Sequence, residues 1–293
     1  MPELPEVETV RRGLQPAMEG QRILRVEQRR PNLRFPFSEH FVKRLEGQVI
    51  TSIARRAKYL LADISSDDVL VMHLGMSGSF RIESAGERET PGAFHHERSK
   101  LSVHDHVVFH MEDGTVVTYN DPRRFGIMLL IPRSELVEHA LFEKMGIEPL
   151  GNALTADYLA GKFKGKSTSM KAALLDQRNV VGLGNIYVAE ALWRAKISPK
   201  RSAGSLVTKA GKPTKRLEPL VEIIQAVLQD AIEAGGSSLR DHAQTDGSLG
   251  YFQHRFSVYD RENVACPRDE CAGSIQKFTQ NGRSTYWCPK CQK

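Results

Sequence analysis

The sequence predicts an α+β protein in which a β-sandwich is followed by a helical region and a metal-binding tail. Between residues 22 and 130, short segments alternate apolar and polar residues, as β-strands do. From Ser134 onward, the apolar residues recur with helical spacing. All four cysteines follow residue 265. We therefore expect two main domains with a boundary near Pro132, and a tail that depends on its cysteines.

The composition is that of an ordinary globular protein. With 293 residues, of which 40% are hydrophobic and 26% charged, the chain can bury two domain cores. It has no run of eighteen apolar residues, and its first residues are acidic, so we expect neither a membrane span nor a signal peptide and place the protein in the cytoplasm. A net charge of +6 is compatible with a polyanionic partner, but it is also common on surfaces without one.

The start of the chain holds a candidate nucleophile. Removal of Met1 would leave a free amine on Pro2, next to Glu3. An α-amino group titrates near pH 8 and a lysine near 10.4, so about 10% of the former and about 0.04% of the latter is unprotonated at neutral pH. Such an amine can attack a carbon and form an iminium. The alternative is a plain helix start at Pro5, and a helix to about Leu14 is compatible with both interpretations.

The first half continues as a series of strands. The expected strands are 23–27, 49–53, 59–64, 69–74, 107–111 and 115–119. Asp113-Gly114 between the last two is typical of a hairpin turn. The polar segment Ser84–Lys100 is expected to be a surface loop.

Helices are expected in the second half. Apolar residues recur with helical spacing at 136–145, 172–175 and 217–232. The basic segment Lys196–Arg216 has no acidic residue and is interpreted as a solvated connector. The segment Gly235–Gly250 is rich in Gly, Ser and Asp and is expected to be a loop that can change shape.

The cysteine pattern C-x4-C-x16-C-x2-C predicts a zinc site. Two pairs of closely spaced thiolates supply the four ligands that Zn²⁺ prefers, and a short tail without its own core needs the metal to fold. The ligands would be Cys266, Cys271, Cys288 and Cys291. Two disulfides are the alternative, which the absence of an export signal disfavours. Arg283 lies between the cysteine pairs, where a ribbon hairpin could hold it against a nucleic-acid backbone.

Several scattered residues are candidates for nucleic-acid contacts. Arg123 and Phe125 lie in the turn Asp121–Gly126, and the aromatic ring could enter a base stack. Met76, expected at a loop tip, is a second apolar candidate. Lys58 precedes an apolar strand, where a lone lysine ordinarily reaches to solvent. Taken singly, each of these residues is more often found in core packing or in a surface turn.

Residues 180–187 contain two glycines but do not predict a dinucleotide site, because no strand precedes them and the third glycine is absent. A glycine turn between two helices, presenting Asn185 to a phosphate, fits better. His104 and His106 alternate on an expected strand. A hydrogen-bonding or phosphate-binding role suits this pair better than a metal site.

Together these motifs resemble the formamidopyrimidine-DNA glycosylase family, whose members are bifunctional enzymes that excise oxidised purines such as 8-oxoguanine. The resemblance covers essentially the whole chain. In addition to the cysteine pairs, the matching motifs are residues 2–9, 55–60, 73–78, 121–126 and 184–187. One departure is the first cysteine pair, which is commonly C-x2-C in the family and is C-x4-C here. Four-residue spacing still permits zinc coordination.

The resemblance implies a β-sandwich catalytic domain at 1–132, a helix-two-turn-helix DNA-binding domain at 133–235, and a lesion loop with a zinc finger at 236–293. It implies one structural Zn²⁺ and a monomer that binds double-stranded DNA containing oxidised bases, in the cytoplasm and at the nucleoid. The damaged nucleotide would be rotated out of the duplex. The segment Gly235–Gly250 would cap the lesion.

The resemblance also assigns roles to single residues. Pro2 would attack the sugar C1′, and Glu3 would be the acid that helps the sugar ring to open. Lys58 would act as a proton donor during strand cleavage, and Arg283 would act in the second cleavage. The residues assigned to the gap left by the flipped base are Met76, Arg123 and Phe125, with Arg123 contacting the orphaned cytosine. The residues assigned to the DNA backbone are His104, Lys166, Asn185 and Arg283.

Two alternatives are open at this stage. One is a related enzyme of the endonuclease VIII type that prefers oxidised pyrimidines, against which stand Leu4 and the combination of Met76, Arg123 and Phe125. The other is a non-catalytic zinc-ribbon protein that binds damaged or bent DNA. The presence of Pro2, Glu3 and Lys58 is evidence against such a protein.

Overall fold

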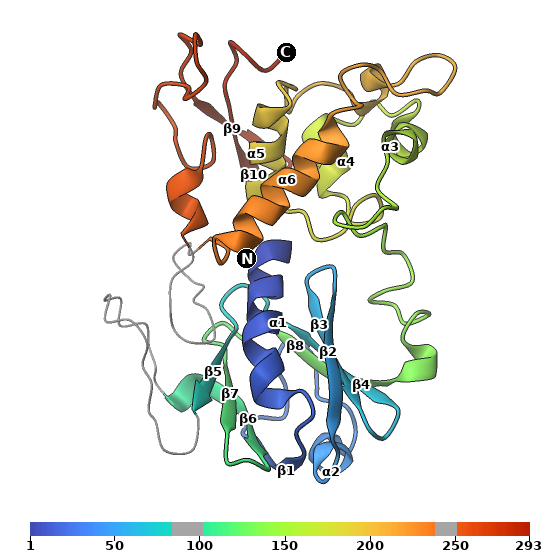
Figure 1. Cartoon of the computed structure of the whole chain (residues 1–293), viewed down its shortest axis with the longest axis vertical. Helices are drawn as coiled ribbons and strands as arrows, with labels where there is room; N and C mark the ends of the chain where they lie inside the picture. Colours follow the sequence, from blue (N-terminus) through green and yellow to red (C-terminus); the bar gives the residue numbers. More distant parts are fainter. Residues whose placement is uncertain (84–101, 238–250) are drawn as a thin grey trace. The chain divides into compact units, whose positions relative to one another are not determined.

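The structure is a computed structural model that describes residues 1–83, 102–237 and 251–293 (Figure 1). The expected loop at 84–100, and all but the first residues of the expected loop at 235–250, lie outside the described residues. The chain divides into two compact units. The first unit comprises Met1–Glu143 and Ala234–Gln253, and the second comprises Lys144–Glu233 and His254–Lys293.

The first unit is a β-sandwich with one long helix. One antiparallel sheet has the order β1-β6-β7-β5, and the other has the order β2-β3-β4-β8. Their bounds are β1 Ile23–Gln28, β2 Ile50–Arg56, β3 Tyr59–Ile64, β4 Asp68–His73, β5 Ser79–Glu83, β6 Asp105–Met111, β7 Val116–Asn120 and β8 Ile127–Pro132. Helices α1 (Leu4–Met18) and α2 (Phe41–Leu45) and the short 3-10 helices η1 (Ser102–His104), η2 (Arg133–Glu135) and η4 (Phe252–Arg255) complete the described elements that begin in this unit. The predicted sandwich is confirmed.

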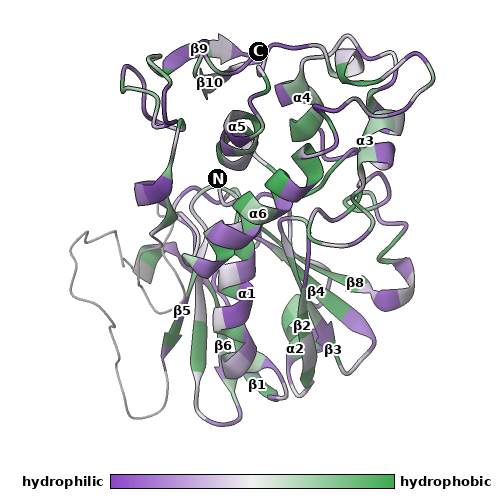
Figure 2. Cartoon of the chain, turned by 45° about the horizontal axis from the view of Figure 1, so that its top comes forward, coloured by the Kyte–Doolittle hydropathy of each residue, from purple (hydrophilic) through white to green (hydrophobic). Residues whose placement is uncertain are grey.

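A single apolar core joins both sheets and α1. Val26 and Phe109 contribute from one sheet, Ile53 and Leu70 from the other, and Val10 from the helix. Hydrophobic and hydrophilic residues alternate around α1 (Figure 2), so one face of the helix is buried while the other carries charge. The helix packs against β2, β3 and β5. This packing holds the start of the chain on the sandwich.

The predicted strands are confirmed with bounds that differ by at most three residues, and the predicted hairpin turn is present. Gly114 has φ +87° and its N–H donates to Met111 O at 3.1 Å. Strands β5 and β8 and helix α2 were not predicted. In β8, four of the six residues are buried on both faces of the strand, so its apolar run has no alternation to recognise.

The predicted helix at 136–145 is wrong, because the short η2 helix ends at Glu135 and only turns and bends follow it there. The N–H groups of Phe142 and Glu143 both donate to His139 O, and the Leu141 N–H donates to His139 Nδ1. The N–H groups of Leu141 and Phe142 therefore do not donate to the carbonyls four residues earlier, and the backbone forms a turn at His139 and not a helix. Val137, which was assigned to the apolar face, is 78% exposed.

The second unit is helical and ends in a two-stranded hairpin. Its elements are α3 (Ala156–Phe163), α4 (Met170–Leu175), α5 (Asn185–Arg194), η3 (Ala203–Leu206), α6 (Leu220–Glu233), β9 (Gln276–Gln280) and β10 (Arg283–Trp287). Helices α5 and α6 pack together, and α5 also contacts α4 and β10. The predicted helices at 172–175 and 217–232 are confirmed, whereas α3 was not predicted. None of the described helices combines the length and apolar content needed to cross a membrane.

A buried glutamate on α5 holds the segment that leads to the hairpin. The Glu190 carboxylate accepts the N–H groups of Ser257, Val258 and Tyr259 at 2.9 to 3.0 Å. Burial raises the pKa of Glu190, while these backbone donors act in the opposite direction. The three bonds satisfy a carboxylate that is only 1% exposed and tie the start of the finger to the helix.

Candidate functional site

The start of the chain is held by a capping box. Glu3 is the N-cap of α1, and the side chains of Glu3 and Glu6 bond reciprocally to each other's backbone, with Glu3 N–H donating to Glu6 Oε2 at 2.8 Å. Both Pro2 and Glu3 are buried, whereas Met1 is 50% exposed. The helix start and the candidate nucleophile are therefore compatible, as the sequence suggested. The capping box fixes the residues that follow Pro2 in one conformation.

Glu6 also binds the segment that begins the predicted capping loop. Its Oε1 accepts the Ser237 N–H at 2.8 Å and the Ser237 hydroxyl at 2.9 Å. Glu6 is only 2% exposed, and Gly236 at φ +79° packs against its side chain. In the sequence, Glu6 is only an acidic residue in the first turn of an expected helix, where the helix dipole favours a negative charge. No sequence signal could have paired it with a serine 231 positions away.

Lys58 lies in the tight turn between β2 and β3, where Ala57 adopts φ +55°. Lys58 is 7% exposed, so it does not reach to solvent in the manner expected of an ordinary lysine before a strand. His73 at the end of β4 lies in its electrostatic field, and His73 Nδ1 accepts the Gly75 N–H at 3.0 Å. Burial, followed by the positive charges of Lys58 and Arg34, lowers the pKa of His73 to about 4.

This shift predicts an acid-sensitive step in stability. His73 is neutral in the folded protein and titrates near 6.5 when unfolded, so the unfolded state binds more protons between pH 6.5 and about 4. Stability therefore falls as the pH drops through this window. We expect the wild-type protein to lose about 2 kcal/mol more than His73→Asn between pH 7 and pH 4.5. Asparagine keeps an acceptor for Gly75 but does not titrate. Urea unfolding at both pH values tests this, and equal losses in the two proteins would contradict it.

The gap-filling candidates come from two loops of the first unit. Met76 lies in the loop after β4, and Arg123 and Phe125 lie in the turn between β7 and β8. The Arg123 guanidinium stacks over the Phe125 ring at 4.8 Å from its centroid. Arg123 is exposed, and Phe125 is 45% exposed although it is a large apolar residue. The structure thus brings an arginine and an aromatic ring together at one exposed turn.

The two histidines do not alternate on one strand as predicted. His104 ends η1 and is half-buried, whereas only His106 belongs to β6. The His106 Nε2 atom lies 2.9 Å from Asp121 O, and burial is the main cause that lowers the pKa of His106. A short 3-10 turn before the strand interrupts the alternation. His104 stays the more accessible of the two.

Lys166 follows a turn in which Gly165 adopts φ +70°. Its carbonyl accepts the Gly204 N–H and the Ser202 hydroxyl, both at 2.8 Å, while its side chain is exposed. The backbone is thus held in place and the ammonium group is presented to solvent. This arrangement suits a phosphate contact.

Asn185 and Arg283 lie close together in the second unit. Asn185 is the first residue of α5, after the predicted glycine turn, and its Nδ2 donates to Ser284 O at 2.9 Å. Arg283, the residue before Ser284, is exposed at the start of β10. Lys171 also donates to Ser284 O, at 2.9 Å, although it is only 1% exposed. Lys171 was missed from the sequence, where it was one of many lysines.

The four cysteines form a site that fits zinc. Their sulfur atoms all lie within 4.8 Å of one another, and two Sγ–Sγ distances are 3.8 Å (Cys266–Cys291) and 3.7 Å (Cys271–Cys288). Tetrahedral Zn–S bonds of about 2.3 Å place sulfurs about 3.8 Å apart. All four cysteines are free thiols, so the two-disulfide alternative is wrong. The C-x4-C spacing therefore still brings the ligands together.

The thiols titrate differently from isolated cysteines. Burial raises the pKa of Cys266, but bonds from the Trp193 indole and the Arg268 N–H outweigh it, and the pKa falls to about 7. Burial, and next to it contact with the Cys288 and Cys266 thiols, raises the pKa of Cys291 to about 12 against an opposing contact from Arg268. Crowded thiols retain protons because thiolates repel, and a divalent ion removes that repulsion.

The additional residues between the first two cysteines, Cys266 and Cys271, join the finger to α5. Arg268, within the C-x4-C segment, stacks on Trp193 at 4.5 Å from the ring centroid and donates to Trp193 O at 2.6 Å. The Trp193 indole N–H in turn donates to Cys266 Sγ at 3.4 Å. The longer C-x4-C segment therefore stabilises the zinc site, because one of its residues, Arg268, binds to a helix of the same unit.

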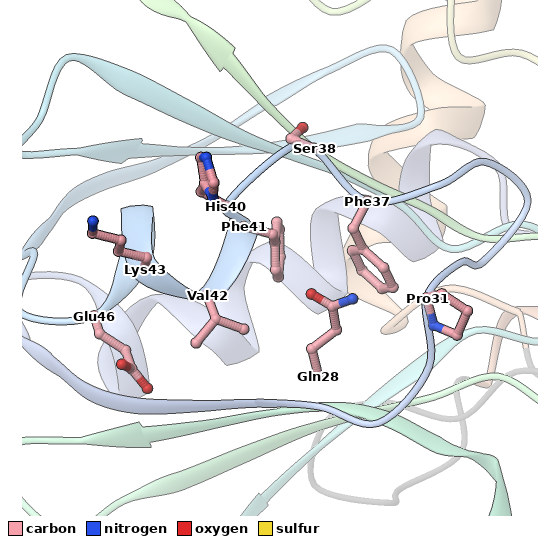
Figure 3. A pocket seen from close by; sticks show the side chains of 9 residues that line it. All are labelled: Gln28, Pro31, Phe37, Ser38, His40, Phe41, Val42, Lys43 and Glu46. Carbon is pink, nitrogen blue, oxygen red and sulfur yellow. The ribbon is translucent and has the colours of Figure 1, made fainter.

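A separate hollow lies between β1 and α2 (Figure 3). It has a volume of about 700 Å³, and the rings of Phe37 and Phe41 in its wall pack at 4.9 Å between centroids, tilted by 48° to each other. The described residues that line it are Gln28, Pro31, Phe37, Ser38, His40, Phe41, Val42, Lys43 and Glu46. None of these is a predicted site residue.

Three family models cover the chain in order. They are the formamidopyrimidine-DNA glycosylase N-terminal domain at residues 1–128, the formamidopyrimidine-DNA glycosylase H2TH domain at 145–243, and a zinc finger found in FPG and IleRS at 265–293. A sandwich with a capped N-terminus, a helical domain and a four-cysteine finger therefore define the class of zinc-finger DNA glycosylases.

Relatives and solved structures identify the same family as the family models do. The formamidopyrimidine-DNA glycosylases of Bradyrhizobium sp. (strain BTAi1) and Sinorhizobium fredii are 62% and 58% identical, and each alignment covers 100% of both chains. The MutM (Fpg) protein of Thermus thermophilus has a TM-score of 0.81 at 36% identity, covering 99% of this chain and 98% of that chain. A Lactococcus lactis Fpg in complex with DNA containing an abasic site has a TM-score of 0.81 at 34% identity, covering 99% of both chains. The chain belongs to the formamidopyrimidine-DNA glycosylase family.

The finger holds one structural Zn²⁺, which can be tested by removing a ligand. Cys288→Ser should lose the metal and weaken binding to duplex DNA by about tenfold or more, equivalent to one charge-assisted phosphate contact. Thr279→Ala, on the exposed face of the same hairpin, should keep both zinc and affinity. Zinc content and DNA titrations measure the effect. Wild-type affinity in a zinc-free variant would show that the finger does not bind DNA.

Proposed function

We propose that this protein is a bifunctional DNA glycosylase and apurinic/apyrimidinic lyase of base-excision repair. It excises oxidised purines, namely 8-oxoguanine and formamidopyrimidines, from double-stranded DNA and then cleaves the strand. The observation that carries the proposal is the buried Pro2-Glu3 pair at a capped helix start, in a chain that shares the family's domains from end to end.

Base release uses the amine of Pro2 once Met1 has been removed. The nitrogen lone pair forms a bond to C1′ while the glycosidic bond breaks, and the departing base takes up a proton. The amine loses its own proton. Glu3 then protonates O4′ as the C1′–O4′ bond opens, and the nitrogen lone pair forms the iminium. The capping box supports this role because it fixes the side chain of Glu3, the residue that follows Pro2 in the chain.

Strand cleavage follows by elimination. Loss of a proton from C2′ expels the 3′ phosphate, and a second elimination expels the 5′ phosphate. Lys58 is proposed as a proton donor, and its burial beside the neutral His73 supports a role beyond solvation. Arg283 is proposed to bind phosphate and to act in the second elimination. Its exposed position beside Asn185 and the twice-bonded Ser284 carbonyl supports this assignment.

Recognition of the damaged DNA is assigned to two loops, those of Met76 and of Arg123 and Phe125, and to several polar side chains. Met76, Arg123 and Phe125 would fill the gap left by the flipped nucleotide, with Arg123 contacting the orphaned cytosine. His104, Lys166 and Asn185 would contact the DNA backbone, which gives salt-sensitive binding. The side-chain exposure of Lys166, Arg123 and Phe125 supports these assignments.

The remaining assignments are also proposals. The catalytic domain is 1–132, the helix-two-turn-helix domain is 133–235, and the lesion loop and finger occupy 236–293. The protein acts as a monomer in the cytoplasm, at the nucleoid while on DNA. Four free thiols support a reducing compartment.

A comparison of duplex substrates tests the proposal. We expect excision of 8-oxoguanine opposite cytosine, followed by a strand break that leaves phosphates at both ends. A protein that acts on oxidised pyrimidines and leaves 8-oxoguanine intact would be an endonuclease VIII-type enzyme. Tight binding without base release or cleavage would identify a non-catalytic zinc-ribbon protein.

A further inference from the structure

We propose that Asp121 is a positioning residue that locks the two gap-filling loops, residues 74–78 and 121–126, into one rigid platform. The proposal rests on the function proposed above. Asp121 opens the turn that carries Arg123 and Phe125, yet it is 0% exposed. It therefore cannot contact DNA, and its carboxylate must serve another part of the protein.

The Asp121 carboxylate accepts hydrogen bonds from both loops. Its Oδ1 accepts the Ser77 hydroxyl at 2.6 Å, which ties it to the loop of Met76. Its Oδ2 accepts the Gly126 N–H at 2.8 Å, which closes its own turn, and the Tyr119 hydroxyl at 3.3 Å. The Ser77 oxygen also accepts the Arg123 N–H at 3.2 Å. One buried charge thus has a donor on each loop.

The backbone of Asp121 extends the same connection to the histidine segment. Its N–H donates to His104 O at 3.0 Å, and its carbonyl lies 2.9 Å from His106 Nε2. The Arg124 N–H donates to the same carbonyl at 3.2 Å, in a residue with φ +56°. The proposed backbone contact at His104 is therefore linked to the proposed gap-filling loops through one residue.

Three glycines let the loops touch through their backbones. A Cβ on Gly75, which has φ +63°, would lie 2.5 Å from the Phe125 carbonyl carbon. A Cβ on Gly126 would lie 1.8 Å from the Tyr119 hydroxyl oxygen, and one on Gly78 would lie 2.4 Å from it. Tyr119 is fully buried. The loops are thus packed without side chains between them, around a hydroxyl that Asp121 binds.

This packing has a functional consequence. Gap-filling side chains on independent loops would each lose conformational freedom on entering the base stack, whereas a rigid platform has lost it beforehand. A carboxylate is required because three donors converge on two oxygens, and asparagine offers one oxygen and turns an N–H group toward a donor. Loosening the platform should therefore impair reading of the opposite base more than the amine chemistry.

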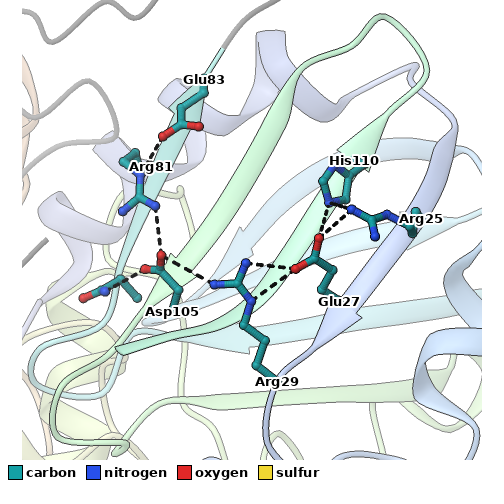
Figure 4. Close-up of polar contacts among 8 residues, drawn as sticks. Arg25, Glu27, Arg29, Arg81, Glu83, Asp105 and His110 are labelled. Carbon is teal, nitrogen blue, oxygen red and sulfur yellow. Dashed lines mark hydrogen bonds and ion pairs between the residues drawn. The ribbon is translucent and has the colours of Figure 1, made fainter. Parts of the chain in front are cut away.

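The closing experiment compares Asp121→Asn with Asp105→Asn. Asp105 is a matched control because it is also a buried carboxylate of the sandwich. It begins β6, accepts from Arg81 at 3.0 Å and from Asn120 at 2.8 Å, and pairs with Arg29 (Figure 4). Among the described residues, Asp105 makes no hydrogen bond or ion pair to loops 74–78 and 121–126. Two readouts are measured for each protein: single-turnover excision of 8-oxoguanine opposite cytosine and opposite adenine, and borohydride trapping on a single-stranded abasic site.

For Asp121→Asn we expect the cytosine-over-adenine preference to fall by about tenfold or more. Trapping on the single-stranded site should stay within about twofold, because that substrate has no opposite base to read. Asp105→Asn should leave the preference unchanged. A general loss of fold would lower both readouts together. If Asp121→Asn does not fold, Ser77→Ala decides. It removes the hydroxyl that donates to Asp121 and accepts the Arg123 N–H, and it should lower the preference by about threefold or more.

The outcomes separate the two proposals. If the wild-type protein excises 8-oxoguanine and both Asp121→Asn and Ser77→Ala keep its cytosine preference, the platform is wrong and the enzymatic function stands. If both readouts of a folded Asp121→Asn fall in proportion, Asp121 supports only the fold, and the inference is again wrong. If the wild-type protein gives neither excision nor trapped adduct, the proposed function fails and the inference falls with it.

Discussion

Pro2→Gly should reduce the borohydride-trapped adduct on an 8-oxoguanine:cytosine duplex by about a hundredfold or more. Glycine keeps an amine but loses the ring that fixes φ, so the nitrogen is no longer aimed by the capped helix start. A misplacement of about 1 Å can cost about a hundredfold in rate. Adding one residue before Pro2 places its nitrogen in a peptide bond without a nucleophilic lone pair, and the adduct should then disappear completely.

Pro5→Gly is the matched control. Pro5 lies in the first turn of α1, so the same substitution perturbs the helix start but leaves the terminal amine in place. We expect its adduct yield to remain within a few-fold of wild type. Intact mass is measured on every preparation to verify that Met1 is absent. A preparation that retains Met1 and still cuts oxidised DNA at full speed would eliminate Pro2 as the nucleophile.

Glu3→Gln should slow base release by about 10² to 10⁴, the range typical of a lost general acid. Glutamine keeps the shape of the side chain and an oxygen that can accept the N–H at the third helical position, so α1 should remain capped. Affinity for the damaged duplex should change little. Single-turnover excision and DNA titrations on the same protein separate the two effects.

Glu8→Gln provides the comparison on the same helix. Glu8 pairs with Arg11 at 2.9 Å and with Arg55 at 3.3 Å, and it is not a candidate acid. Hydrogen bonds and the charges of these arginines outweigh burial and lower the pKa of Glu8, so the substitution should cost some stability without slowing excision. Equal excision rates for Glu3→Gln and the wild-type protein would remove Glu3 from the mechanism.

Much of the architecture could be read from local patterns. Strand alternation, the Asp113-Gly114 turn and the apolar faces of α1 and α6 depend on neighbours within a few residues, so they are visible in the chain itself. The same holds for the spacing of the cysteine pairs. The family motifs in turn indicate the catalytic candidates.

Local patterns misled where side chains or buried strands set the backbone. The helix expected at 136–145 is absent because the N–H groups of Leu141 and Phe142 donate to His139 and not to the carbonyls four residues earlier. Strand β8 was not predicted because both of its faces are apolar, so its sequence lacks the alternation of apolar and polar residues. Lys58 looked like a solvated lysine, and only the turn between β2 and β3 shows it to be buried.

The chain's own pattern thus specified the β-sandwich, several of the helices and the metal ligands, and it supplied candidates for the chemistry, because periodicity and spacing express short-range geometry. Folding alone brought Ser237 to Glu6, Ser77 to Asp121 and Lys171 to Ser284. Each of these contacts joins residues far apart in sequence and satisfies a buried polar group. Such pairing depends on which polar groups are buried together when the segments pack, so only the tertiary structure determines it.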